Sequence, residues 1–361
     1  MTMKFFGFLS ILLSFLMVLS GCGQVAYLSQ LGWHQGAIAH QSIPVEEILK
    51  DNRVSSEIKA KIRFIQDVKR YGEETLGLKK TKNYSRFYET RGPILYVVTA
   101  CEKDRLRLRT WEFPLVGEIT YKGFFSKEEA FKERDDLSRQ DQDTYVQAVA
   151  AYSTLGWLND PIFSSMIQSN PVALANLVLH EMTHATLYFR GRTDFNEQVA
   201  TFIGNRGAIE FLTGRYGRDS GEVTDAIHIQ RDDLVFSRWI DHTCRHLSEF
   251  YASEISREEK LKGREVLFQS MKKEFNEIKA GLKTEAYKGF DRIELNNAVL
   301  LAYHRYVHRL EMYDLLYERL ENDLRQVVEF LKQVPATEQD PSSYIERWLA
   351  ETRTGVFSPP Q

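Results

Sequence analysis

One stretch of the sequence limits the possible folds more than any other: HEMTH at residues 180–184, followed by FNE at residues 195–197. His180 and His184 are four residues apart, so on a helix their imidazoles lie on one face, with Cβ atoms about 5–6 Å apart. The segment RGRTDF between the two motifs is short and contains a glycine. The pattern therefore predicts two antiparallel helices joined by a short loop, which would bring Glu197 to both histidines.

Local signals support a helix on each side of this loop. Pro171 suits the first turn of the first helix, and apolar residues recur behind it at helical spacing. Gly191 is a plausible cap for the end of this helix, and Thr193 or Asp194 for the start of the next.

Two histidines and a glutamate are a common ligand set for catalytic zinc, with the fourth position left for water. Glu181 flanks the same helix face, where it can reach an activated water without binding the ion. Zinc lowers the pKa of such a water toward about 7. We therefore expect Zn²⁺ at His180, His184 and Glu197. Glu181 would take the proton and pass it to the leaving amine of a peptide. The alternative is an amphipathic helix that carries two histidines by chance and binds no metal.

Hydrolysis also needs a donor for the developing oxyanion. The segment NNAVLLAYHRYVHRL, residues 296–310, places Tyr303 and Tyr306 on a helix together with His304 and His308. Both tyrosines are candidate catalytic donors, and packing in the core is the alternative for each. Three further histidines could supply a donor or a second metal site: His228, His242 and His246. The last two are again four residues apart, but no acid lies between them as in HExxH, which favours surface or core roles.

Composition indicates a globular protein without affinity for nucleic acid. The 361 residues are 43% hydrophobic, and acidic and basic residues nearly cancel to a formal charge of -3. A chain of this length can bury a large core. Its near-neutral charge argues against nucleic acid as a partner.

The N-terminal part predicts a tether followed by helices. Residues 24–46 contain few charges and predict a tether that leads into a short helix. Apolar residues at spacings of three to four then predict two helices within residues 45–76, with a break near residues 51–55.

The middle of the chain predicts strands, and the remainder predicts helices. β-branched and aromatic residues dominate residues 92–104 and 111–125, which indicates strands of a small sheet. Ser126 is placed to cap a short charged helix, and residues 144–157 again suit an extended chain. From Pro171 to about residue 350 the pattern is almost wholly helical.

The first residues have the features of an export signal. Lys4 precedes an apolar run that is shorter than the roughly 20 residues of a membrane-spanning helix. LSGC then resembles the lipobox of bacterial lipoproteins, which predicts a signal peptide at residues 1–21 and acylation of Cys22. Gly23, in place of an aspartate, favours the outer membrane, facing the periplasm. A plain secretory signal with an incidental cysteine is the alternative.

Two cysteines, Cys101 and Cys244, would remain besides Cys22 in the mature chain. An oxidising compartment permits them to form a disulfide. Two separate buried thiols are equally compatible with the sequence.

The chain resembles a known family, the predicted zinc aminopeptidases that occur as lipoproteins in bacterial envelopes. The resemblance rests on AYSTLGWLNDP, HEMTH and FNEQVATF, with further matches at YLSQLGWHQG, FPLVGEITYKGFF and LNNA, and it covers nearly the whole mature chain. It implies zinc ligands at His180, His184 and Glu197. It also implies that Glu181 is the catalytic acid and base.

The fold that we expect is α+β and mostly helical, with a small β-sheet packed on a zincin-like helical core and a C-terminal helical region. Residues 22–361 would form a single zinc metallopeptidase domain. Within it we expect a tether and helices at 22–90, the sheet and zinc-site helices at 91–215, and the C-terminal helices at 216–361.

Two departures from well-known zinc peptidases bear on specificity and on the ligands. The Gly-x-Met-Glu-Asn loop with which many zinc aminopeptidases hold a free amine does not occur in this sequence. The segment AYSTLGWLND lies in the corresponding position and would either line the cleft as an edge strand or serve packing. Thr201 stands where thermolysin-like enzymes carry an aspartate that orients a histidine ligand, so we expect Asp194 or Asn196 to do this instead.

The leading hypothesis is a lipid-anchored zinc metallopeptidase that acts on peptides, with aminopeptidase activity favoured by the resemblance. Its partners would be a peptide substrate and the membrane that holds the lipid on Cys22. The alternative is a non-catalytic envelope assembly or binding lipoprotein that retains the zincin scaffold. Glu181 counts against this alternative, because a structural zinc site needs no acid at that position.

Overall fold

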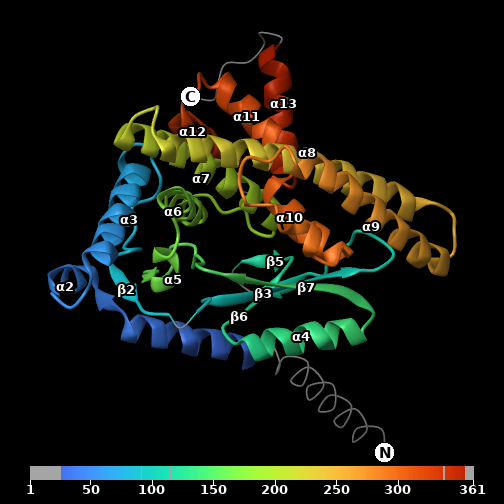
Figure 1. Cartoon of the computed structure of the whole chain (residues 1–361), viewed down its shortest axis with the longest axis horizontal. Coiled ribbons are helices and arrows are strands. Elements are labelled where there is room, and N and C mark those ends of the chain that lie inside the picture. Colours follow the sequence, from blue (N-terminus) through green and yellow to red (C-terminus); the bar gives the residue numbers. More distant parts are fainter. Residues whose placement is uncertain (1–25, 91, 114–115, 336–337, 354–361) are drawn as a thin grey trace, which may run out of the picture.

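The computed structural model describes residues 26–90, 92–113, 116–335 and 338–353. The expected signal peptide and Cys22 lie outside these residues. Helices dominate the described part, and short strands form small sheets beside them (Figure 1). The prediction of a mostly helical α+β fold is confirmed. No helix in the described part is both long and apolar enough to cross a membrane.

Residues 26–41 form one helix, whereas the sequence predicts a tether that leads into a short helix over residues 24–46. The helix packs against a sheet: the Tyr27 hydroxyl donates to the carbonyl oxygen of Gly123 at 2.7 Å, and the Tyr27 ring lies 5.7 Å from that of Phe124. Figure 1 shows it in dark blue beneath the strands. Contacts with residues distant in sequence stabilise this helix, and local sequence patterns do not reveal such contacts.

Two further helices follow, with the predicted break between them. They are α2 (Val45–Lys50) and α3 (Ser56–Glu74). The Ser55 hydroxyl caps α3 by accepting a hydrogen bond from the backbone N–H of Ile58 at 3.3 Å. One face of α3 is buried in the main hydrophobic core, and this face carries the apolar residues whose helical spacing predicts the helix.

The largest sheet is antiparallel and has β3 (Leu95–Glu102) at its centre, between β6 (Lys122–Phe124) and β7 (Gln142–Val149). Helix α4 (Lys127–Arg139) packs on this sheet and is capped by Ser126, as predicted. Apolar residues fill the space between sheet and helix: Val98, Ala100, Phe124, Ala130 and Leu137.

Two smaller sheets complete the described strands. One is the hairpin of β4 (Trp111–Phe113) and β5 (Gly117–Ile119). The other joins β1 (Ile43–Pro44), β2 (Arg86–Tyr88) and β8 (Ile162–Phe163), with β2 at its centre. The strands predicted within residues 92–104 and 111–125 are therefore confirmed, although they belong to two different sheets.

After β8 the described chain is mostly helical, and the sequence predicts this from Pro171 onward. Its helices are α5 (Ser164–Ile167), α6 (Pro171–Thr186), α7 (Thr193–Tyr216), α8 (Gly221–Ala252), α9 (Arg257–Lys279), η1 (Phe290–Arg292), α10 (Asn297–Val307), α11 (Leu310–Arg319), α12 (Leu324–Gln333) and α13 (Pro341–Arg353). Helices α6 and α7 contribute to the main core. Helices α8, α9 and α10 enclose a second, strongly aromatic core.

Helices α6 and α7 approach each other closely because α7 carries glycines where they meet. A Cβ atom at Gly204 would lie 3.0 Å from the carbonyl oxygen of Asn176, and one at Gly207 would lie 2.7 Å from Cδ1 of Leu179. Such distances leave no room for a larger side chain without movement. The glycines therefore set the spacing of the two helices that carry the HEMTH and FNE motifs.

The loop between α6 and α7 is held differently from the prediction. Gly191 has φ +72° but lies within the loop, beyond the end of α6, and Thr193 and Asp194 already belong to the first turn of α7. The expected caps at these residues are therefore wrong. The Asn196 side chain instead accepts from the backbone N–H of Phe189 and donates to its carbonyl oxygen, both at 2.8 Å. This pair of bonds replaces the missing caps.

Candidate metal centre

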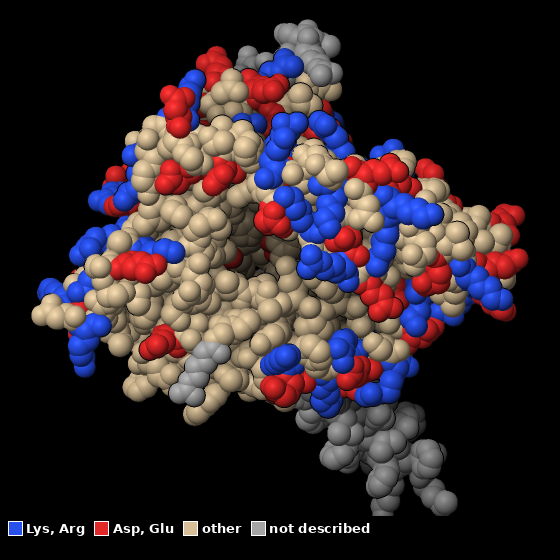
Figure 2. Space-filling model, in the orientation of Figure 1, with Lys and Arg blue, Asp and Glu red and all other residues tan. Residues whose placement is uncertain are grey.

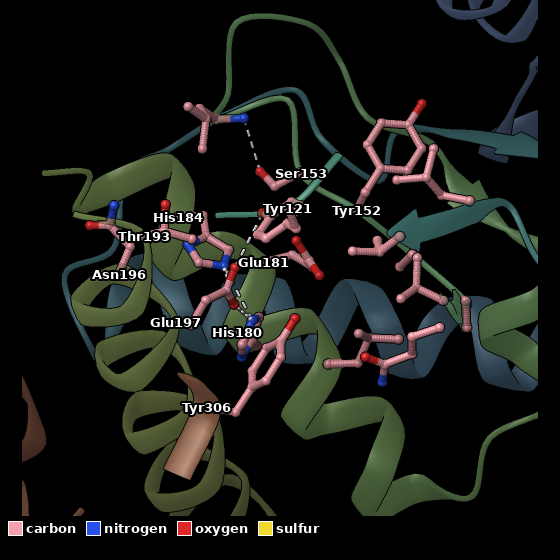
Figure 3. A pocket seen from close by; sticks show the side chains of 18 of the residues that line it. Tyr121, Tyr152, Ser153, His180, Glu181, His184, Thr193, Asn196, Glu197 and Tyr306 are labelled. Atoms are coloured by element: carbon pink, nitrogen blue, oxygen red, sulfur yellow. Dashed lines mark hydrogen bonds and ion pairs between the residues drawn. The ribbon is translucent and has the colours of Figure 1, made fainter. Parts of the chain in front are cut away.

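The structure brings His180, His184 and Glu197 together at one point (Figure 3). The two histidines project from one face of α6, and Glu197 projects from the first turns of α7. The two histidine Nε2 atoms are 3.2 Å apart. Oε2 of Glu197 lies 3.3 Å from Nε2 of His180 and 3.4 Å from Nε2 of His184.

These distances fit a metal ion. Ligands of a tetrahedral zinc ion, bound at about 2.0–2.1 Å, lie about 3.3–3.4 Å from one another. An ion of that size would fit between the three atoms with almost no rearrangement. All three side chains are largely buried, with 14% exposure for His180, 10% for His184 and 7% for Glu197. The group can therefore hold a metal ion that is shielded from bulk solvent.

The charges within the group favour a cation. Burial by itself would raise the pKa of Glu197, but His184 and His180 lower it below its ordinary value. Burial by itself would lower the pKa of His184. The Glu197 carboxylate acts in the opposite direction, and the net result is that the pKa of His184 is raised above its ordinary value. A carboxylate held between two imidazoles requires compensating positive charge, which either protons or a metal ion can provide.

Glu181 lies beside this group and lines the same cleft. Figure 3 shows its carboxylate next to His184, on the side that faces the open space. Burial raises the pKa of Glu181 above its ordinary value, and His180 and His184 partly oppose this rise. A carboxylate with a raised pKa that faces a cleft is suited to exchanging a proton with a molecule bound there.

Tyr121 supports the glutamate from the opposite side. It lies in the bend between β5 and β6, and its hydroxyl donates to Oε1 of Glu197 at 3.3 Å. The guanidinium of Arg305 lies 5.0 Å from the centre of the Tyr121 ring. Tyr121 was not among the predicted site residues, because it lies in the strand-like segment FPLVGEITYKGFF, whose spacing gives no sign of a role beside a metal ligand. Only the folded chain brings it to Glu197.

Neither residue that we expected to orient a histidine does so. Asp194 accepts a hydrogen bond of 3.4 Å from the Thr120 hydroxyl, and Asn196 is occupied by the backbone of Phe189. In the described part of the chain, Nδ1 of His184 has no hydrogen-bond partner. The orientation of the His184 imidazole is therefore set by its packing and by its contacts with His180 and Glu197.

The two candidate oxyanion donors occupy different places. Tyr306 of α10 lines the cleft, its ring centre lies 6.3 Å from that of His180, and its hydroxyl points toward the side on which Glu181 lies (Figure 3). Tyr303 packs in the second core, with its ring centre 4.9 Å from that of Phe290, and it does not line the cleft. For Tyr303 the structure therefore favours the alternative of packing in the core, because its ring faces the aromatic core.

The cleft that contains the group has a volume of about 390 Å³. Figure 2 shows a hollow at the centre of the molecule, between the sheet and helices α6 and α10. Residues 147–153 form one wall, and apolar side chains form much of the remainder: Leu95, Val97, Ile119 and Leu177. The cleft therefore offers both a strand edge and an apolar surface next to the candidate metal group.

The AYSTLGWLND segment borders this cleft as an irregular loop. Strand β7 ends at Val149, so residues 150–157 are not the continuous strand that the sequence predicts. Asp160 holds the loop by accepting from the backbone N–H and the hydroxyl of Thr154, at 3.0 and 2.6 Å. Burial raises the pKa of Asp160 to about 6. Ala151, Tyr152, Ser153 and Leu155 of this loop line the cleft.

The remaining histidines and cysteines lie elsewhere. His228, His242 and His246 do not line the cleft, and the last two are exposed. A second group that could hold a metal consists of Asp241, His304 and His308. Sequence spacing alone did not reveal it, because its carboxylate is on α8, whereas His304 is on α10 and His308 directly follows that helix. Cys101 and Cys244 are free, buried thiols rather than a disulfide.

A comparison with models of protein families identifies the family of this chain. Residues 26–348 match the family model described as "Putative aminopeptidase". No curated protein and no solved structure shows a significant match to the chain. The match includes the helix pair with the metal-ligand group and both walls of the cleft, and it supports a peptidase function. The chain belongs to this aminopeptidase family.

Proposed function

We propose that this protein is a zinc metallopeptidase that hydrolyses peptide bonds in the cleft between the sheet and helices α6 and α10. The observation that carries the proposal is the triangle of His180, His184 and Glu197, whose ligand atoms are 3.2–3.4 Å apart. These three residues would hold Zn²⁺. The ion would supply Lewis acidity to the scissile carbonyl and to the attacking water.

Glu181 acts as the general base and then as the general acid. It accepts a proton from the attacking water and delivers that proton to the leaving amine, so the carboxylate is regenerated in each cycle. Its buried position at the cleft wall supports this role, because burial raises the affinity of the carboxylate for a proton. A scaffold without catalysis gains nothing from an acid at this place.

Tyr306 stabilises the oxyanion. Its hydroxyl faces the cleft from α10, across from the loop at residues 150–157. A phenol at that position can donate to negative charge that develops on the carbonyl oxygen. Tyr121 does not take this role, because its hydroxyl already donates to Glu197.

The peptide substrate binds along the wall formed by residues 147–153. Strand β7 is at the edge of its sheet, so a bound peptide can add to it through main-chain hydrogen bonds. The apolar side chains of the cleft favour a hydrophobic residue beside the scissile bond. We propose aminopeptidase activity, in line with the family.

The carboxylates that line the cleft in the described part of the chain are Glu181 and Glu197, and both already have roles. A free N-terminus therefore has to be recognised by neutral groups of the cleft, such as Gln147 and Asn176. Matched peptides with free and with acetylated N-termini test this point. A preference for the free form supports an aminopeptidase, and equal rates indicate an endopeptidase.

We also propose that the protein is held at the outer membrane, facing the periplasm, by lipid on Cys22. The signal-like sequence before Cys22 supports this. Metabolic labelling with palmitate should mark the wild type and not Cys22→Ser. Labelling of neither protein would refute the anchor without affecting the proposed chemistry.

The decisive experiment compares Glu181→Gln with the wild type in zinc content and in hydrolysis of a peptide library. We expect the variant to keep its zinc and to lose about 10²–10⁴-fold in kcat. Glu210→Gln is the matched control, because Glu210 lies on α7 and bonds Tyr71 and Tyr317 outside the cleft. Zinc binding without hydrolysis by the wild type would favour the non-catalytic lipoprotein. Absence of zinc in the wild type would refute the proposal.

A further inference from the structure

Helices α8 and α10 carry a second group of metal-ligand atoms, separate from the cleft. Oδ1 of Asp241 lies 3.0 Å from Nε2 of His304 and 2.7 Å from Nδ1 of His308. The two imidazole rings stack, with centres 4.2 Å apart and planes 25° apart. All of the ligand atoms lie within 4.8 Å of one another.

The composition of this group matches that of a transition-metal site. His304 of α10 and His308 directly after it are four residues apart, and Asp241 adds a carboxylate from a neighbouring helix, so the group has the same kinds of ligand as His180, His184 and Glu197. Two imidazoles and one carboxylate are common ligands of zinc and of other divalent first-row metals. The remaining coordination positions would be taken by water, for which there is access from one side.

Access comes from a hollow beside Asp241. It has a volume of about 610 Å³ and is also lined by Arg309 and Glu311. The side chains of the group are 17–30% exposed, so an ion could enter from solvent. Two nearby arginines are already paired with acids: Arg238 with Glu311 at 2.6 Å, and Arg309 with Glu346 at 3.3 Å. Asp241 therefore faces histidines rather than a permanent cation.

The alternative is a hydrogen-bonded group without a metal, because 2.7 and 3.0 Å are hydrogen-bond lengths. An ion would require the ligand atoms to separate by a few tenths of an ångström. It would also require one imidazole to rotate out of the stack, because each nitrogen coordinates a metal in the plane of its ring. The end of α10 permits this movement, since His308 is the residue after its last turn and Arg309 then adopts φ +57°. His308 is thus on a bend and not within a rigid helix.

We propose that Asp241, His304 and His308 bind a second divalent transition-metal ion, which ties α10 to α8. Residues two positions apart on a helix project about 200° apart. His304 and His308 therefore lie on the opposite side of α10 from Tyr306. The second ion fixes the helix that presents Tyr306 to the cleft, while it remains outside the cleft itself. This proposal does not depend on the proposed peptidase function.

Metal stoichiometry tests the proposal directly. The full chain, purified without a histidine tag and loaded with Zn²⁺, should bind two equivalents by elemental analysis after removal of free metal. His180→Ala/His184→Ala should bind one equivalent, through the second group. Asp241→Asn and His308→Gln should each bind one equivalent, through the first group. A variant that combines His180→Ala/His184→Ala with Asp241→Asn should bind none.

His242→Ala/His246→Ala is the matched control, because this pair also has the four-residue spacing and lies on α8 next to Asp241. Its rings are 6.3 Å apart and it should leave both equivalents in place. Co²⁺ loading of His180→Ala/His184→Ala should add a visible absorption band that Asp241→Asn abolishes in that background. The proposal is overturned if His180→Ala/His184→Ala binds no equivalent, or if the equivalent that it binds survives Asp241→Asn or His308→Gln in that background.

Discussion

The Tyr121 hydroxyl donates to Oε1 of Glu197 at 3.3 Å, which leaves Oε2 to face both His180 and His184. The bond crosses 76 positions of sequence and joins the β5–β6 bend to the start of α7. The two oxygens of the carboxylate therefore have different partners, Tyr121 for one and the two histidines for the other. Such partners of a metal ligand orient it and raise its affinity for the ion.

Tyr121→Phe should weaken zinc binding by about tenfold, the lower end of the range for loss of such a partner, because the bond is long. The phenylalanine ring keeps the contact with Arg305. Competition with a chromophoric chelator measures the dissociation constant. Tyr188→Phe is the control, since Tyr188 lines the same cleft but bonds the carbonyl oxygen of Val116 at 3.1 Å. Equal zinc affinity in both variants would show that Tyr121 does not support the ligand.

Tyr306→Phe should lower kcat by about 10²–10³-fold with little change in KM, because the lost hydrogen bond forms only in the transition state. Tyr303→Phe should leave kcat near the wild-type value, since Tyr303 packs in the second core. Steady-state kinetics on one peptide measures both variants. If Tyr303→Phe is the slower enzyme, the assignment of the two tyrosines is reversed.

Gly204→Ala should lower the free energy of unfolding by about 1–3 kcal/mol and weaken zinc binding, because the new methyl group would press on the backbone of Asn176 and on His180. Gly214→Ala, on the same helix, is the control: a Cβ atom there meets nothing within 4 Å. This control should stabilise the protein by about 1 kcal/mol through helix propensity. Urea unfolding and zinc titration measure both effects. A stabilised Gly204→Ala would refute the close approach of α6 and α7.

Asp233 should make the protein less stable as the pH rises from about 4 to 6. It accepts hydrogen bonds of 2.6 Å from Tyr287 and from Asn205, and burial raises its pKa to about 6. Because the folded-state pKa is the higher one, the stabilisation is fully present below the unfolded-state pKa near 4 and is lost as the pH passes 6. The shift corresponds to about 3 kcal/mol at most.

Asp233→Asn should remove this part of the pH dependence. Urea unfolding at pH 4 and pH 7 should show that the variant gains stability relative to the wild type at the higher pH. Asp225→Asn, an exposed position on the same helix, provides the matched change of carboxyl to amide. A difference between variant and wild type that stays constant with pH would contradict the prediction.

The parts of the fold that follow from local patterns were predictable. Helical periodicity and capping residues identify α3, α4 and the helices after Pro171, and β-branched runs identify β3. The helix at residues 26–41 was not predictable in this way, because contacts such as that of Tyr27 with Gly123 stabilise it. The loop caps failed for a similar reason, since Asn196 holds the turn through its side chain.

The candidate site also has a part that local sequence patterns predict and a part that they do not. Sequence spacing brings His180, Glu181, His184 and Glu197 together, because all four lie on two consecutive helices. Tyr121 and the Asp241 group depend on which distant segments meet, and spacing carries no such information. Tyr303 and Tyr306 share a helix, so sequence could name both as candidates. Only the packing of α10 decides which of them faces the cleft.

The position of the metal ligands on consecutive helices also has a consequence for how the protein matures. A pairing of neighbouring helices forms early, since it closes only a short loop. The β5–β6 bend that carries Tyr121 and helix α10 that carries Tyr306 dock through contacts of much longer range. If the chain binds the proposed ion, we therefore expect a newly made chain to capture it before the surrounding walls are complete, so that metal binding would precede catalytic competence.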